Sequence, residues 1–206
     1  MFSSKEIKYY LLLLAAILPF FLIDQSITVW IKEFKNANPG MAQFLRYPDT
    51  AAYYMGHGTP LITAGALLYL AGRYWRHEKI RLIGLRLFWG FICSGAALQV
   101  IKHLLGRARP RITDQLLFIG PSIRGSYDSF PSGHAALAAC LAYTLSSYFP
   151  GYRILFWAYA LFVMIGRVDS ASHFTADVLG GALVGIIVAR LAEKKIGRPA
   201  DSLPGR

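Results

Sequence analysis

A short polar run leads directly into an apolar one between residues 130 and 145, which read Phe130-Pro-Ser-Gly-His134-Ala-Ala-Leu-Ala-Ala-Cys140-Leu-Ala-Tyr-Thr-Leu145. Pro131 suits the first turn of a helix because its missing N–H would have no helical partner there, and Ser129 is the expected cap. Ser132, Gly133 and His134 would then lie in that first turn, where free N–H groups meet the positive end of the helix dipole. The stretch therefore predicts an anion-binding site, here called the anion seat. The Ser132 hydroxyl and the His134 imidazole beside it favour phosphate as the anion.

The composition is that of an integral membrane protein. Of the 206 residues 55% are hydrophobic, the mean hydropathy is +0.40 and the formal net charge is +11. A transmembrane helix needs about 20 mostly apolar residues, and six windows of about that size occur, at 9–31, 56–72, 83–105, 132–149, 153–168 and 174–192. We therefore expect an all-α polytopic membrane protein, with six transmembrane helices in a bundle that forms a single domain over residues 1–206.

The first window follows Lys5 and Lys8 and is expected to be a retained helix rather than a cleaved signal. Its apolar residues continue past Pro19 without a small-residue cleavage site, and five more windows follow. Pro19 should kink the helix, and Asp24 should face protein or the interface because a carboxylate is costly in lipid. The segment 32–55, which contains Asn, Gly and Pro, is predicted to be an exposed or interfacial excursion that helps line an entrance.

Basic residues are distributed unequally over the two ends of the predicted bundle, thirteen against nine. The thirteen are Lys5, Lys8, Arg73, Arg76, Lys79, Arg81, Arg86, Arg153, Arg190, Lys194, Lys195, Arg198 and Arg206. Because basic residues favour the cytoplasm, we expect both termini there and residues 130–134 at the outer face, the periplasmic side of the inner (plasma) membrane in a bacterium. The charge follows the membrane flanks and is not interleaved with exposed aromatic residues, which argues against a nucleic-acid partner.

Two cations close the third window, in the stretch Lys102-His-Leu-Leu-Gly-Arg-Ala-Arg109-Pro110. Lys102 and Arg109 are seven residues apart, which is about two helical turns, so both can point to one side, and Pro110 ends the helix. A pair of snorkelling cations at a membrane surface is the plainer explanation. The shared location with the anion seat, on one predicted face, favours a common site.

The connection between the fifth and sixth windows carries Arg167 and His173, and Asp177 follows. His173 and Asp177 are four residues apart at a helix start, where side chains at that spacing are neighbours. Asp177 can accept a hydrogen bond from one imidazole nitrogen and leave the other as a free, oriented nucleophile. A polar pair that only stabilises a helix start is the alternative. Three such features on one face make a shared functional site the better interpretation.

Together these features resemble the three signature motifs of the type 2 phosphatidic acid phosphatase family, also called lipid phosphate phosphatases. The residues that match, in order and spacing, are Lys102-x6-Arg109-Pro110, Pro131-Ser-Gly-His134 and Arg167-x5-His173-x3-Asp177. The resemblance covers residues 102–177 and agrees with a six-helix layout. The family usually has serine before the third-motif arginine, whereas this chain has Gly166.

The resemblance implies a phosphatase mechanism that needs no metal or other cofactor. His173 would attack phosphorus and form a phosphohistidine, with Asp177 holding its tautomer. His134 would protonate the leaving oxygen and later activate water. The non-bridging oxygens would be held by Lys102, Arg109, Ser132, Gly133 and Arg167. The sequence also has no zinc spacing, Walker pattern or carboxylate cluster of the kind that a metal site requires.

The expected substrate is a membrane lipid that carries a phosphomonoester or a diphosphate. Arg107 and Arg124 are candidate headgroup contacts and, with Arg111, bring more cation than one phosphate needs, although they would also suit anionic lipid. Bacterial members of the family suggest undecaprenyl diphosphate, phosphatidylglycerophosphate, phosphatidic acid and lipid A phosphates. A lipid phosphotransferase would share the motifs, whereas a vanadate-dependent haloperoxidase would be soluble and a membrane scaffold would not need the histidines. The sequence does not predict an oligomeric state.

Overall fold

The computed structural model describes residues 2–197, and these form helices and connecting segments without a strand. In chain order the elements are α1 (Ser4–Ala37), α2 (Pro39–Met55), α3 (Gly58–Tyr74), α4 (Glu78–Leu105), α5 (Gly133–Tyr148), the 3-10 helix η1 (Pro150–Tyr152), α6 (Arg153–Asp169) and α7 (Thr175–Ile196). The all-α fold is confirmed, and a helix lies in each of the six apolar windows. The segment 32–55 is largely exposed, as expected, and it is helical, because α1 continues to Ala37 and α2 fills most of the remainder.

Four segments in the described part of the chain are long and apolar enough to cross a membrane. They are α1, α4, the segment Pro150–Asp169 that joins η1 to α6, and α7. α3 and α5 have 17 and 16 residues, fewer than the roughly 20 that a membrane-spanning helix needs. The chain is therefore an integral membrane protein, and six membrane spans remain a prediction.

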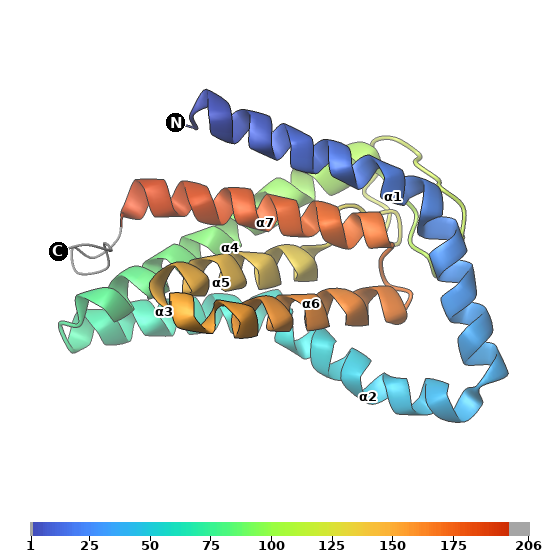
Figure 1. The fold of residues 1–206 in the computed structure, drawn as a ribbon, viewed down its shortest axis with the longest axis horizontal. Coiled ribbons are helices and arrows are strands. Elements are labelled where there is room, and N and C mark those ends of the chain that lie inside the picture. The colour runs from blue at the N-terminus through green and yellow to red at the C-terminus, as the bar shows by residue number, and fades with distance from the viewer. Residues whose placement is uncertain (1, 198–206) are drawn as a thin grey trace.

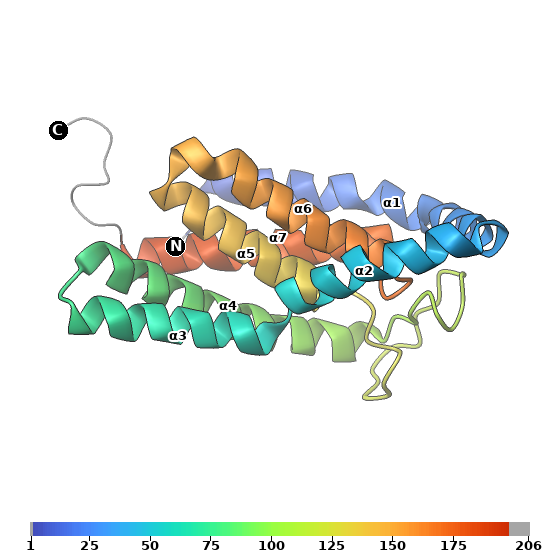
Figure 2. The same ribbon diagram turned by 90° about the horizontal axis from the view of Figure 1, so that it is seen from below.

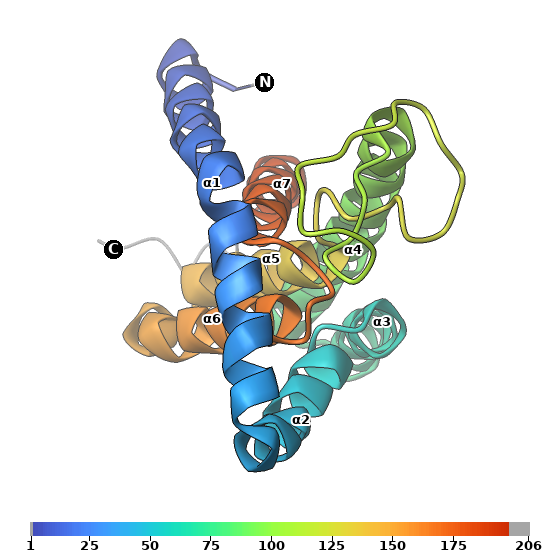
Figure 3. The ribbon, with the colours of Figure 1, turned by 90° about the vertical axis from the view of Figure 1, so that its right-hand side faces the viewer.

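α5 lies at the centre of the bundle, against α4, α6 and α7 (Figure 3). Much of its buried surface is alanine, and fully buried positions include Ala135, Ala136, Ala138, Ala139 and Ala142. On α7, Gly181 and Gly185 have the spacing of small residues that lets two helix backbones approach closely. A Cβ at Gly185 would contact the carbonyl oxygen of Ala136, and one at Gly181 would contact that of Ser132. This close contact positions the start of α5 against the start of α7.

α1 is bent, and its second half crosses one end of the bundle (Figures 1 and 3). Pro19 lies inside this helix, where it removes one backbone hydrogen bond and permits a kink. The long connection 106–132 and the connection between α6 and α7 lie at the end that α1 crosses (Figure 2). The start of α1 and the end of α7 lie together at the opposite end (Figure 1). The segments that carry the sequence motifs therefore meet at one end of the molecule.

The charge count used for orientation needs one correction. Arg86, counted among the residues that flank the membrane, is fully buried in α4. Its guanidinium lies 4.9 Å from the centroid of the Tyr148 ring and 3.6 Å from a carboxylate oxygen of Glu193. It therefore adds no surface charge. Arg198 and Arg206 lie outside the described residues.

Candidate active site

The three motif segments are joined by backbone hydrogen bonds. The N–H of Ser132, before α5, donates to the carbonyl oxygen of Asp177 in α7 at 2.9 Å. The N–H of Ser129 donates to the carbonyl oxygen of Arg107 at 3.0 Å, which joins the first motif segment to the second. The residues predicted from three separate stretches of sequence are thus brought together around the N-terminus of α5.

Unpartnered polar atoms mark the predicted anion seat. Ser132 precedes α5 with an extended backbone, and Gly133 is the first helical residue. A Cβ built on Gly133 would meet nothing within 4 Å, so the backbone is open to a ligand. Ser132 Oγ, His134 Nε2 and Arg167 Nε are buried and have no hydrogen-bond partner within the described residues. Such atoms are costly and rare, and their position near a helix N-terminus indicates a site for an anion.

Ser129 is not the cap that the sequence predicted. Its hydroxyl donates a hydrogen bond to Asp177 Oδ2 at 2.5 Å, and its carbonyl oxygen accepts one from His173. Ser132 occupies the cap position, and its side chain makes no capping hydrogen bond. The Ser132 hydroxyl is therefore left for a ligand, while Ser129 holds the residues behind the site.

His173 is held through Nδ1, but not by the partner that the sequence predicted. Nδ1 lies 2.8 Å from the carbonyl oxygen of Ser129 and 3.7 Å from Asp177 Oδ2, so the direct hydrogen bond to Asp177 is absent. A carbonyl oxygen only accepts, which assigns the proton to Nδ1 and leaves the lone pair on Nε2. Burial lowers the pKa of His173, and Asp177 opposes this shift without cancelling it. The ring is therefore neutral at pH 7.

Asp177 instead belongs to a buried ionic network. Its carboxylate accepts hydrogen bonds from Arg107 Nη1 at 2.5 Å and from the backbone N–H of Phe174 at 2.8 Å. Arg107 Nη2 donates to Asp24 Oδ2 of α1 at 2.7 Å, so Asp24 faces protein as predicted. Arg107 is fully buried, and its assignment as a headgroup contact is therefore wrong. A guanidinium enclosed in this way is tolerated because two carboxylates pair with it.

Lys102 and Arg109 converge on a carboxylate that the sequence did not single out, although the predicted helix through Arg109 is wrong: α4 ends at Leu105, before Gly106, and Arg109 lies in the connection that follows. Arg109 Nε and Nη2 each lie 2.8 Å from an oxygen of Asp128, and Lys102 Nζ lies 3.7 Å from Asp128 Oδ2. Burial alone would raise the pKa of Asp128, but the hydrogen bonds and charge of Arg109, together with Lys102, hold it well below its usual value. Asp128 is therefore ionised throughout the physiological pH range.

Arg167 extends from the end of α6, where two serine hydroxyls hold it. Its Nη2 donates to Ser170 Oγ at 3.1 Å and to Ser172 Oγ at 2.5 Å. At the preceding position, a Cβ on Gly166 would contact the Cβ of Ala52 in α2. The departure from the usual family serine thus accompanies a close approach of α2 to α6.

The end of α2 and the residue before α3 form a wall of the site; the segment was expected to help line an entrance, but its residues Tyr53 and His57 were not singled out. The ring of Tyr53 lies 5.1 Å from that of His134 and the ring of His57 lies 6.1 Å from it, between centroids. Tyr53 also lies 5.4 Å from the guanidinium of Arg167. The available signal was the aromatic run Tyr53-Tyr54-Met55-Gly56-His57 directly before the second apolar window.

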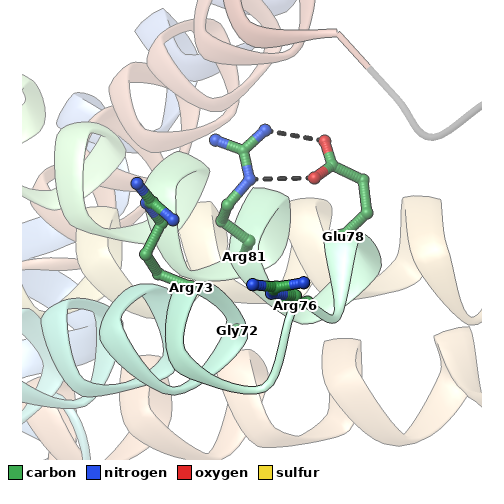
Figure 4. Close-up of a pocket in the computed structure, with 5 residues that line it drawn as sticks. All are labelled: Gly72, Arg73, Arg76, Glu78 and Arg81. Carbon is green, nitrogen blue, oxygen red and sulfur yellow. Dashed lines mark hydrogen bonds and ion pairs between the residues drawn. The ribbon is translucent and has the colours of Figure 1, made fainter.

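Two further groups of arginines lie on the connection 106–132 and at the turn between α3 and α4. Arg111 and Arg124 are exposed on the connection 106–132, so Arg124 stays a candidate headgroup contact. A different polar pocket, of about 560 Å³, lies at the turn between α3 and α4, at the end of the bundle away from the motifs. Figure 4 shows its lining residues, which are Gly72, Arg73, Arg76, Glu78 and Arg81.

The fold and the site define an integral membrane protein with a histidine-containing anion site at one end of a helical bundle. The sequence profile of the PAP2 superfamily matches residues 83–197. The match covers more than half of the chain, and the chain belongs to this superfamily.

Curated relatives and solved structures agree with that assignment. Lipid A 1-phosphatase of Rhizobium johnstonii is 33% identical over 106 residues, which are 50% of this chain and 43% of the relative. Phosphatidylglycerophosphatase B of Bacillus subtilis is 34% identical over 101 residues, 44% of this chain and 46% of the relative. The chain thus spans less than half the length of these relatives.

Two crystal structures have the same fold. The PAP2-type phosphatidylglycerolphosphate phosphatase from Bacillus subtilis superposes with a TM-score of 0.65 at 25% identity, covering 92% of both chains. Aquifex aeolicus LpxE gives a TM-score of 0.53 at 24% identity, covering 79% of this chain and 93% of its own. The second likeness supports the fold alone.

Proposed function

We propose that this protein is a membrane lipid phosphatase that hydrolyses a phosphomonoester or diphosphate through a phosphohistidine on His173. One observation carries the proposal: Nδ1 of His173 is bound to the Ser129 carbonyl, and the unpartnered Ser132 Oγ, His134 Nε2 and Arg167 Nε belong to the same group of motif residues. A fixed nucleophile beside an anion seat is the arrangement that phosphoryl transfer to histidine requires.

In the first step, the Nε2 lone pair of His173 forms a bond to phosphorus while the bond from phosphorus to the lipid oxygen breaks. His134 gives a proton to that leaving oxygen. In the second step, His134 takes a proton from water, the water oxygen attacks phosphorus, and the phosphorus–nitrogen bond breaks. Inorganic phosphate leaves and His173 is regenerated.

Charge stabilisation is proposed to come from Lys102, Arg109 and Arg167, with hydrogen bonds from Ser132 and the Gly133 N–H. Because the protein itself would supply three cations to the phosphate, we expect turnover to continue in the presence of a chelator. Asp177 acts behind His173, through Ser129 and Phe174, and not by a direct hydrogen bond.

The proposal includes an orientation. The start of α1 and the end of α7 lie away from the site (Figure 1), at the end that carries Arg73 and Arg76 (Figure 4). By the positive-inside rule this end is cytoplasmic. α3 and α5 would complete six spans, and the site would open on the outer face of a bacterial inner membrane.

Phosphate release by the purified protein tests the function. The panel should contain lipid A, phosphatidylglycerophosphate, phosphatidic acid and undecaprenyl diphosphate, because two relatives are named for the first two and the motifs admit all four. We expect release from at least one lipid, its loss in His173→Ala, and its retention in His77→Ala, a matched change at the turn between α3 and α4. Radiolabel that moves to a second lipid instead of water would identify a phosphotransferase. No reaction with any of the four would refute the proposal.

A further inference from the structure

Asp128 is paired with Lys102 and Arg109, the two cations that are expected to bind the substrate phosphate. Its carboxylate oxygens accept hydrogen bonds from Nε and Nη2 of Arg109, each at 2.8 Å, and Lys102 Nζ lies 3.7 Å from Oδ2. This two-pronged geometry is also the one in which arginine binds two oxygens of a phosphate. One edge of a guanidinium can hold only one anion in this way.

The attachment of Asp128 differs from that of the structural carboxylate in the same site. Asp177 is fully buried and is held by Arg107, Ser129 and a backbone N–H. The side chain of Asp128 is 32% exposed, and its hydrogen bonds to other residues go only to Arg109 within the described residues. Asp128 can therefore turn toward solvent, and Arg109 and Lys102, whose side chains are 17% and 11% exposed, would then need another anion as a partner.

We propose that Asp128 is an internal competitor for the substrate phosphate. It neutralises Lys102 and Arg109 while the seat holds no phosphate, and an arriving phosphate displaces it. The inference rests on the proposed function for the assignment of this seat to phosphate.

Two consequences follow from this competition. Asp128 weakens the binding of inorganic phosphate, so the product leaves more readily. The same competition raises KM for the lipid.

If Asp128 had a different role, its removal would change phosphate affinity in the opposite direction. If Asp128 only orients Arg109, its removal should weaken phosphate binding because the guanidinium loses its position. Competition predicts tighter binding. The direction of the change therefore separates a competitor from a positioning residue.

The test uses inorganic phosphate as the probe and the full chain in detergent micelles. Its apparent Kd is obtained from the dependence of Tm on phosphate concentration, which needs no turnover. Asp128→Asn should lower this Kd by about three- to tenfold. The lower figure corresponds to the loss of a partly exposed ion pair, and the higher figure to the loss of a two-pronged charged hydrogen bond. Asp128→Ala should shift it in the same direction. KM for a lipid substrate should fall with it, and kcat should not rise.

Asp114→Asn is the matched control, because Asp114 lies on the same connection as Asp128, is 33% exposed and pairs with Lys32 of α1. It should leave the phosphate Kd unchanged. An unchanged or weaker Kd in both Asp128 variants would overturn the inference even if the wild type hydrolyses lipid. Tighter phosphate binding in a protein that hydrolyses none of the lipids would instead refute the proposed function and leave the competition in place.

Discussion

The substitution Asp24→Ala tests how far the active site depends on α1. Asp24 Oδ2 accepts from Arg107 at 2.7 Å, and Oδ1 accepts from the backbone N–H of Ala176 at 3.0 Å. Both partners belong to segments that hold Asp177, and Arg107 is fully buried. Removal of the Asp24 carboxylate leaves a buried guanidinium with one counter-charge and a backbone donor without an acceptor.

The expected cost is large because both Asp24 and its partner Arg107 are buried. Removing one partner of a buried ion pair costs about 3 to 5 kcal/mol. At roughly 2 to 4 °C per kcal/mol for a chain of this size, Tm should fall by roughly 6 to 20 °C. Asp24→Asn keeps one acceptor and should cost less, about 1 to 3 kcal/mol. The order of stability should be wild type, then Asp24→Asn, then Asp24→Ala.

Thermal unfolding of the purified variants in detergent measures this order. Asp114→Ala provides the control, since its pair with Lys32 is about one-third exposed on both sides and should be worth no more than about 1 kcal/mol. If Asp24→Ala melted at the same temperature as Asp114→Ala, the buried network would not stabilise the fold and the argument would be wrong.

Three further predictions concern the site and its orientation. Gly166→Ser restores the usual family residue but places a Cβ against that of Ala52, so activity should fall, and Ala52→Gly in the same chain should recover part of it. Since burial lowers the pKa of His173 below its usual 6.5, the loss of rapid-quench labelling on acidification should be centred below pH 6.5; a loss of labelling centred at or above pH 6.5 would contradict the shift. Ile123 is 89% exposed on the connection 106–132, so a cysteine there should react with an impermeant reagent in intact cells, whereas reaction only after permeabilisation would reverse the orientation.

The parts of the site that lie in local motifs were predictable from the sequence. Ser132, Gly133 and His134 follow from the helix-start signal at Pro131, and the structure places them at the N-terminus of α5. Lys102 and Arg109 do meet, but not through helical spacing, because α4 ends at Leu105 and Arg109 lies in the connection 106–132.

Partners from distant segments were not predictable in this way. Asp24 and Arg107 are separated by 83 positions, and no periodicity links them. The spacing of His173 and Asp177 correctly predicted neighbours, but the Ser129 carbonyl takes the hydrogen bond because the connection 106–132 folds over the ring. Such contacts depend on tertiary packing.

The helix α2 shows a different limit. The Asn, Gly and Pro residues of segment 32–55 predicted an exposed excursion but not a helix, yet Pro39 begins α2, where its missing N–H has no cost, and Pro48 lies inside it. The packing of α2 against α6 outweighs the local preference. The sequence placed this segment near an entrance but did not single out Tyr53, which lies beside His134.

The most direct test of the central claim is to trap the covalent intermediate. Wild-type protein should be mixed with a lipid carrying radiolabelled phosphate and quenched within one turnover, under alkaline conditions that preserve phosphohistidine. We predict label on His173 in the wild type and none in His173→Ala, with the label accumulating in His134→Ala when an activated aryl phosphate replaces the lipid. Hydrolysis by the wild type without any label, or label on a residue other than His173, would contradict the account.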